Sequence, residues 1–282
     1  MLRSSRALLL GVLAAALTAA SAQKPRSPVL VELFTSEGCS SCPPADALLS
    51  RFDHEQPIPN ADIIALGEHV DYWDHLGWRD RFSSSDFTRR QRSYQSTFHL
   101  DDIYTPQVVV NGSSQFNGTD SAAISRAIEQ AAARTVPLQF IAVHLEPGNR
   151  ITFTLANGPV DHSEYIRIFG ALVDPSATTQ ISAGENGGRT LHHVAVVRTL
   201  DMLGESWHMK DLGMHPFSLS LKSPANLTGM RLVVFAQTKP FGPILATVSC
   251  VLSTTSATHL PATAHFPENS CPTISASTIE KQ

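Results

Sequence analysis

The most constraining feature of the sequence is a close pair of cysteines, Cys39-Ser40-Ser41-Cys42, between a predicted strand and a predicted helix. The apolar run Val29–Phe34 predicts a buried strand, and Ala45–Phe52 predicts a helix whose first turn tolerates proline. A thiol at a helix start meets unpaired N–H groups and the positive end of the helix dipole, which favours the thiolate. We therefore expect a redox couple in which a solvent-facing Cys39 attacks and Cys42 resolves the mixed disulfide.

A Cys-x-x-Cys pair has other uses. Half of a zinc ribbon needs a second close pair, whereas Cys250 and Cys271 lie far apart in the sequence. Haem attachment needs a histidine after the second cysteine, where Pro43 stands. A purely structural Cys39–Cys42 disulfide stays open as an alternative. We expect Cys250 and Cys271 to form a structural disulfide that pins the tail and contributes roughly 3 kcal/mol.

Residues 1–22 have the composition of a secretory signal peptide. Arg3 and Arg6 precede an apolar run over residues 7–20, and Ala20-Ser21-Ala22 predicts cleavage after Ala22. The run is shorter than the roughly 20 residues of a membrane span, so an uncleaved anchor is the alternative. We expect a secreted or periplasmic protein without a membrane attachment after cleavage, in which all four cysteines meet an oxidising compartment.

The composition excludes several classes of protein. With 42% hydrophobic residues, the chain is neither wholly disordered nor collagen-like. A formal net charge of −4 gives no reason to expect nucleic acid as a partner. A chain of 282 residues with four cysteines is also not a disulfide-dense miniprotein.

The pattern of apolar residues divides the chain in two at Pro137. Residues 28–135 predict an α/β domain of order β-α-β-α-β-β-α, and residues 137–252 change to a period of two, which predicts a β-sandwich-like domain. A tail rich in Ser, Thr and Pro follows over residues 253–282. Besides the first strand and helix, the first domain has predicted strands at Ile63–Val70, Gln107–Asn111 and around Gln115, and predicted helices at Ser85–Phe98 and Ser121–Arg134. The second has predicted strands at 138–145, 150–155, 164–173, 191–199, 216–221, 231–237 and 243–252.

A proline just before the third strand gives this order a family resemblance. Thr105-Pro106 stands where thioredoxin-like proteins place a cis proline, so residues 28–135 resemble a thioredoxin-like domain. The resemblance implies that Pro106 is cis, lies beside the disulfide and, with Thr105, shapes a groove for an extended substrate.

Three longer motifs narrow the resemblance. CSSCPPAD (residues 39–46), HVDYWD (69–74) and YTPQVVVNG (104–112) resemble a secreted thioredoxin-like family catalogued as a domain of unknown function. The similarity includes Gly184–Arg189, which we expect to be a strand connection or a docking element against the first domain. Since this family has no settled activity, the resemblance indicates a fold rather than a reaction.

The chain departs from well-known thioredoxins in two ways. Those enzymes carry a buried carboxylate six residues before the nucleophile, whereas Glu32 lies seven before Cys39. A longer loop could let Glu32 accept the proton of Cys42 when Cys42 attacks, or Glu32 could have no catalytic role. The dipeptide Ser40-Ser41 is also different, and because this dipeptide helps to set the reduction potential, the direction of electron flow stays open.

The segment Glu68–His75 places ionisable and aromatic residues at the end of the second strand, where sites of α/β sheets form. We expect His69, Asp71 and Trp73 to contact the disulfide or a substrate. The alternatives are a hydrogen-bonded loop in which Trp73 packs in the core, and a Cu(I) site of Cys39, Cys42 and His69.

These features predict an exported thiol–disulfide oxidoreductase that acts on extracytoplasmic proteins or small thiols and needs no organic cofactor. Two alternatives are a secreted binding module with a structural Cys-x-x-Cys disulfide and a copper carrier.

Overall fold

We describe the protein from a computed structural model. The structure describes residues 26–134, 138–146, 150–157, 165–208, 217–220, 227, 229–252, 254–255 and 274–275. The predicted signal peptide, Pro137, Cys271 and most of the predicted tail lie outside the described residues. Within the described ranges, no helix has both the length and the apolar character that crossing a membrane requires.

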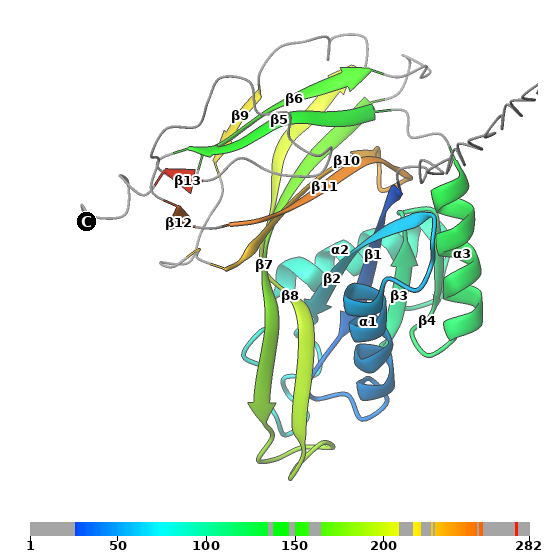
Figure 1. The fold of residues 1–282 in the computed structure, drawn as a ribbon. Coiled ribbons are helices and arrows are strands. Elements are labelled where there is room, and N and C mark those ends of the chain that lie inside the picture. Colours follow the sequence, from blue (N-terminus) through cyan, green and yellow to red (C-terminus); the bar gives the residue numbers. More distant parts are fainter. Residues whose placement is uncertain are drawn as a thin grey trace, which may run out of the picture.

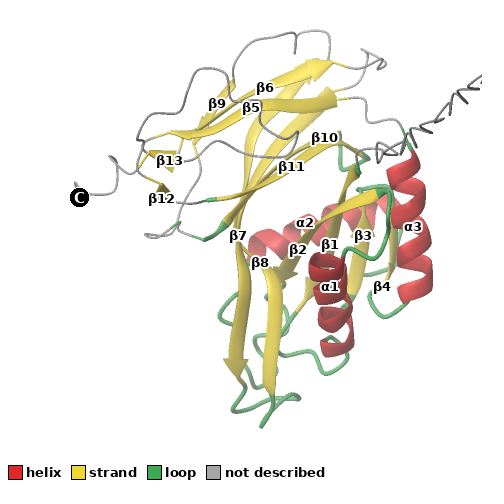
Figure 2. Cartoon of the chain, in the orientation of Figure 1, coloured by secondary structure: helices red, strands yellow, loops and turns green. Residues whose placement is uncertain are grey.

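The first half alternates strands and helices. In chain order its elements are β1 (Ser27–Thr35), α1 (Pro43–Glu55), β2 (Ala61–His69), α2 (Ser85–Phe98), β3 (Gln107–Val110), β4 (Ser114–Asn117) and α3 (Ser121–Ala133). β1 pairs with β2 in parallel and with β3 in antiparallel fashion, and β3 pairs with β4 in antiparallel fashion. Helices α1 and α3 lie in front of these strands and α2 lies behind them (Figures 1 and 2).

Local chemistry explains where two of these helices begin. The Ser84 side chain accepts a hydrogen bond from the Asp86 backbone N–H at the start of α2, and Asp120 accepts one from the Ala123 N–H at the start of α3. Each side chain satisfies a backbone donor that has no partner within the helix.

The second half consists of strands. They are β5 (Leu138–Glu146), β6 (Arg150–Asn157), β7 (Tyr165–Gln180), β8 (Thr190–His208), β9 (Phe217–Ser220), β10 (Arg231–Thr238), β11 (Ile244–Val251), β12 (Thr254–Thr255) and β13 (Ile274–Ser275). β5, β6 and β9 form a three-stranded sheet, and β12 pairs with β13.

The β7–β8 hairpin is much longer than the sequence predicts. We expect strands that end at Val173 and Thr199, but the two strands stay paired from Tyr165–His208 to Gln180–Thr190. Among the described strands, β10 pairs with β7 only as far as Val173. Beyond Val173 no described strand pairs with this edge of β7, and Pro175 is tolerated there because it has no ladder hydrogen bond to donate. Figure 1 shows the hairpin passing from the strand-rich half down along the α/β half.

One sheet joins the two halves, which we predicted as separate domains. Its eight strands lie in the order β11-β10-β7-β8-β2-β1-β3-β4, and β8 meets β2 in parallel at Gly67 and Val196. A side chain on Gly67 would lie 3.1 Å from the carbonyl oxygen of Val194. The main hydrophobic core likewise contains residues of both halves, among them Val31 and Phe235.

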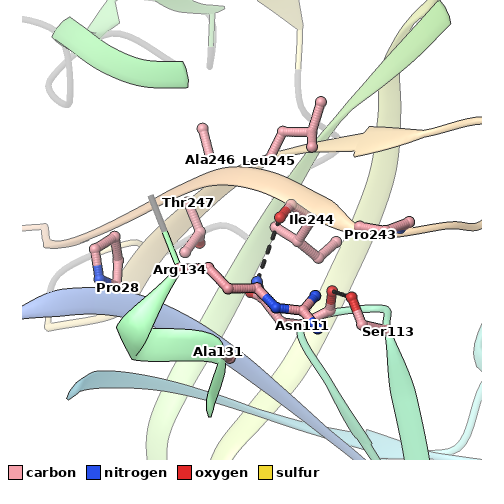
Figure 3. A pocket seen from close by; sticks show the side chains of 10 residues that line it. All are labelled: Pro28, Asn111, Ser113, Ala131, Arg134, Pro243, Ile244, Leu245, Ala246 and Thr247. Carbon is pink, nitrogen blue, oxygen red and sulfur yellow. Dashed lines mark hydrogen bonds between the residues drawn. The ribbon is translucent and has the colours of Figure 1, made fainter. Parts of the chain in front are cut away.

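A pocket of about 160 Å³ lies where the two halves meet, at the opposite end of β1 from the cysteine pair. Figure 3 shows Arg134 and Ser113 beside it, and the Asn111 side chain, which donates to the Ile244 carbonyl oxygen at 3.3 Å. Because this pocket contains none of the predicted site residues, we do not assign it to the candidate site.

We expect Gly67→Ala to destabilise the protein by about 1–3 kcal/mol, because the added methyl group meets backbone oxygens that cannot move independently of the sheet. Urea unfolding of the variant and the wild type measures the difference. Equal free energies of unfolding would contradict a close approach of β8 to β2.

Candidate functional site around Cys39 and Cys42

Cys39 and Cys42 form a disulfide at the start of α1, with their Cα atoms 5.4 Å apart. Cys42 is the N-cap residue of the helix, and its carbonyl oxygen accepts hydrogen bonds from the N–H groups of Ala45 and Asp46. The prolines at the first helical positions lack N–H groups that would have no partner within the helix. The cysteine pair therefore lies at the strand-to-helix junction where the sequence places it.

The disulfide is buried, so our expectation of a solvent-facing Cys39 is wrong. Both cysteines have 0% exposed surface. The turn between β7 and β8 covers this region: the Asn186 side chain donates to the carbonyl oxygens of Glu37 (2.9 Å) and Cys39 (3.0 Å). The Gly184–Arg189 segment is thus both a strand connection and a docking element.

Pro106 and Trp73 lie close to the same helix start. The Thr105–Pro106 peptide bond is cis, as the resemblance implies. A side chain on Gly118 would lie 2.8 Å from Cβ of Pro106 and 2.9 Å from Cβ of Ala45 in α1, so Gly118 allows these segments to meet. The Trp73 indole N–H donates to the Thr105 hydroxyl at 2.8 Å. Trp73 also lies against Gly38, next to Cys39.

Two buried histidines lie edge to face beside the cysteine loop, which is the segment of residues 36–42 between β1 and α1. His69 at the end of β2 and His193 on β8 have ring centroids 4.8 Å apart. His69 Nδ1 lies 2.6 Å from a carboxylate oxygen of Asp80, which also accepts the Glu37 backbone N–H at 2.8 Å. Burial opposes the charge of Asp80, but His69 and the backbone N–H groups of Glu37 and Phe82 outweigh this effect and lower the pKa of Asp80.

His193 lies between two carboxylates that flank the cysteines in the sequence. Its Nε2 is 3.6 Å from Glu37 Oε1, and its Nδ1 is 3.8 Å from Asp46 Oδ2. Burial favours the neutral ring, but Asp46 and Glu37 outweigh this effect and raise the pKa of His193 to about 9. His193 is therefore a buried cation at pH 7, contributed by the second half of the chain.

The two carboxylates are themselves held in place. Asp46 accepts a hydrogen bond from the Thr35 hydroxyl at 2.9 Å, and Glu37 accepts one from the Trp78 indole at 2.9 Å. Burial raises the pKa of Glu37, but the neighbouring polar side chains of His193, Thr179 and Trp78 outweigh this effect and lower it. Glu37 is thus an ionised carboxylate two residues before Cys39.

Glu32 belongs to a different cluster. Its carboxylate lies 2.5 Å from Arg90 Nε and accepts the Tyr94 hydroxyl at 2.6 Å, both from α2. Burial and the neighbouring Glu32 raise the pKa of Glu68 well above its usual range. Within the described residues, the hydrogen bonds and the ion pair of Glu32 go to Arg90 and Tyr94 rather than to Cys42, so they do not support the predicted proton transfer.

Asp71 contacts α2 rather than the disulfide: its carboxylate accepts the Thr88 hydroxyl at 2.6 Å. The described residues contain no group of three or more His, Cys, Asp or Glu side chains arranged to hold a metal ion. Cys250 is disulfide-bonded, and because Cys271 lies outside the described residues, their pairing stays a prediction.

Sequence reasoning missed several residues of the site. Consecutive histidines, His192-His193, in an otherwise apolar run were a usable signal, because a buried ionisable side chain needs partners. Glu37 and Asp46 were visible only as neighbours of the cysteines. Asp80 gave no signal, and Asn186 was included only as a member of the Gly184–Arg189 motif, because the contacts of both residues depend on how distant segments meet.

The fold and site define a mixed α/β protein with a buried Cys-x-x-Cys disulfide at a helix start. The chain belongs to the family described as proteins of unknown function, DUF1223, whose model matches residues 30–237.

Two solved structures share the fold. A crystal structure of a protein from Agrobacterium tumefaciens is 22% identical, with a TM-score of 0.63 over 85% of this chain and 100% of that one. HBP35 of Porphyromonas gingivalis is 14% identical, with a TM-score of 0.56 over 86% of this chain and 81% of that one. At these identities the likeness concerns the fold alone. A comparison with curated proteins gives no match.

We expect the stability of the protein to fall as the pH rises from about 6.5 to about 9. A raised pKa means that the folded state binds the His193 proton more tightly than the unfolded state does. The protonated ring therefore stabilises the fold fully below the ordinary pKa of 6.5, and this contribution is lost as the pH rises through about 9. The loss is on the order of 3 kcal/mol. Urea unfolding at pH 6 and pH 9.5 measures it, and the His193→Gln variant should lack most of this pH dependence. An equally steep loss in the variant would contradict the ionised state of His193.

We expect Arg90→Leu to cost about 3–5 kcal/mol, because it leaves the buried Glu32 without its cation. Arg89→Leu is the matched control: Arg89 is next to Arg90 in the sequence, but its side chain is 68% exposed. We expect the control to stay within about 0.5 kcal/mol of the wild type in urea unfolding. A similar small effect of both substitutions would show that Arg90 does not hold this cluster.

Proposed function

We propose that the protein carries out thiol–disulfide exchange through Cys39 and Cys42, on proteins or small thiols outside the cytoplasm. The observation that carries the proposal is the Cys39–Cys42 disulfide at the start of α1. At that position the positive end of the helix dipole favours the thiolate produced on reduction. Trp73, which is partly exposed, and the buried cis Pro106 lie close to the same helix start.

We also infer that residues 28–135 form a thioredoxin-like domain. Its support is the order β-α-β-α-β-β-α together with the strand order β2-β1-β3-β4, in which β3 is antiparallel to β1. For residues 137–252 we infer a β-sandwich-like arrangement, supported by the contact of β5 from the small sheet with β11 of the large one. Export is inferred from the composition of residues 1–22.

A structural disulfide is the second candidate, because both cysteines are fully buried. In that case the protein is a binding module and the bond resists turnover. The two candidates differ in reduction potential, since structural disulfides lie below about −300 mV.

Titration of the purified protein against glutathione redox buffers, followed by alkylation of free thiols, distinguishes the two candidates. We expect Cys39 and Cys42 to equilibrate with the buffer at a potential between about −270 and −120 mV. Cys39→Ser is the control, because it removes the couple without affecting Cys250. A potential below about −300 mV, or no exchange over hours, would overturn the redox proposal.

A further inference from the structure

The turn that joins β7 to β8, residues 181–189, is a compact structure that we call the hairpin tip. The Ile181 N–H donates to the Arg189 carbonyl oxygen at 2.9 Å, and the Gly188 N–H donates to the Ile181 carbonyl oxygen at 2.8 Å. Gly184 and Gly188 adopt positive φ angles of 73° and 84°, which favour glycine. The hairpin tip is therefore held by its own hydrogen bonds and can act as a unit.

Asn186 is the central contact between the hairpin tip and the cysteine loop. Its side chain is 1% exposed and donates to the carbonyl oxygens of Glu37 and Cys39. The Arg189 guanidinium donates to the Asn186 side-chain oxygen at 3.0 Å. This last hydrogen bond fixes the orientation of the amide, because the oxygen faces Arg189 and the nitrogen faces the cysteine loop.

A second contact lies at the surface. The Glu185 carboxylate accepts a hydrogen bond from the Ser40 backbone N–H at 3.2 Å. The carbonyl oxygen of Cys39 and the N–H of Ser40 belong to the same peptide group. The hairpin tip thus offers this one peptide group both a donor, from Asn186, and an acceptor, from Glu185.

The C=O and N–H of one peptide group point in opposite directions, so an extended polypeptide lying along the cysteine loop can replace one of these two hydrogen bonds. A backbone N–H of the polypeptide can donate to the Cys39 carbonyl oxygen in place of the Asn186 amide. We propose that the hairpin tip is a displaceable cover of the disulfide, and that an extended, cysteine-containing segment of a partner protein takes over the hydrogen bond of Asn186 to the carbonyl oxygen of Cys39. This inference rests on the proposed function, because it identifies the partner class of that same disulfide.

Once the hairpin tip moves, the sulfur atoms of Cys39 and Cys42 are accessible and exchange with a partner dithiol in two steps. A partner thiolate attacks Cys39 Sγ, the Cys39–Cys42 bond breaks, and Cys42 leaves with the electron pair and takes up a proton. A second partner thiolate then attacks the partner sulfur of the mixed disulfide and releases Cys39. The partner dithiol is oxidised to a disulfide and the Cys39–Cys42 pair is reduced; the reverse sequence oxidises the pair.

The rate of reduction by dithiothreitol tests the cover. We expect Asn186→Ala to accelerate reduction of the native protein by about tenfold or more, since it removes two hydrogen bonds of the cover. Glu185→Ala should have a smaller effect in the same direction, because its single hydrogen bond is exposed. Ser182→Ala, an exposed position on the same tip, is the matched control and should react like the wild type.

Unfolding must be separated from local opening. The unfolding rate of each variant is measured in parallel, and reduction through the cover should be faster than global unfolding. A wild-type rate of reduction for Asn186→Ala, or reduction only at the rate of global unfolding, would overturn the cover. The glutathione titration of the same variant separates the two proposals: an equilibrating couple with an unchanged rate rejects the cover alone, whereas no equilibration in any variant rejects the redox function.

The partner class is tested with two reductants of the wild-type protein. A reduced, unstructured peptide of about ten residues with one central cysteine is compared with glutathione at equal thiolate concentration. We expect the peptide to react about tenfold faster with the wild type and to lose most of this advantage with Asn186→Ala. Equal rates of peptide and glutathione with the wild type would overturn an extended polypeptide as the displacing partner.

Discussion

The close approach of β8 to β2 at Gly67 is the contact on which the architecture of the site depends. Because Gly67 has no side chain, the backbone of β8 reaches the edge of the α/β half, and one sheet continues through both halves. This contact places His193 beside His69 and lets the same hairpin continue to Asn186. The disulfide environment is therefore assembled from segments that are far apart in the sequence.

The buried charges are arranged in two separate groups. Arg90 compensates Glu32, and its guanidinium also lies over the rings of Phe169 and Phe235. His193 compensates Glu37 and Asp46 around the cysteine loop. Each group joins residues of both halves. Arg90 of α2 donates a hydrogen bond to Gln237 and lies over Phe235, both of which belong to β10, and His193 belongs to β8. Buried ions of this kind are costly unless every charge has a partner, so the two halves depend on each other electrostatically.

Sequence patterns predicted the local elements well where periodicity and capping residues act within a short segment. Helix Ser85–Phe98 and the position of the cysteine pair at the start of α1 are examples. The length of the β7–β8 hairpin was not predictable, because Pro175 signals a turn and only the free edge of β7 makes it acceptable. The burial of Cys39 was missed because it depends on a contact between positions 39 and 186, which no local pattern contains; the Gly184–Arg189 motif indicated a docking element but not which residue it contacts. The position of Glu32 before the cysteines suggested a proton acceptor, whereas its actual neighbours are on α2.

The sheet connection also has a consequence for the order in which the chain is made. β2 pairs with β1 early, but its other edge meets β8 at Val196, roughly 130 residues further along the chain. At a synthesis rate of about 5–20 residues per second, this edge stays unpaired for on the order of ten seconds. An unpaired strand edge readily pairs with other chains. The first half alone therefore exposes a strand edge that can pair with other chains until the hairpin covers it.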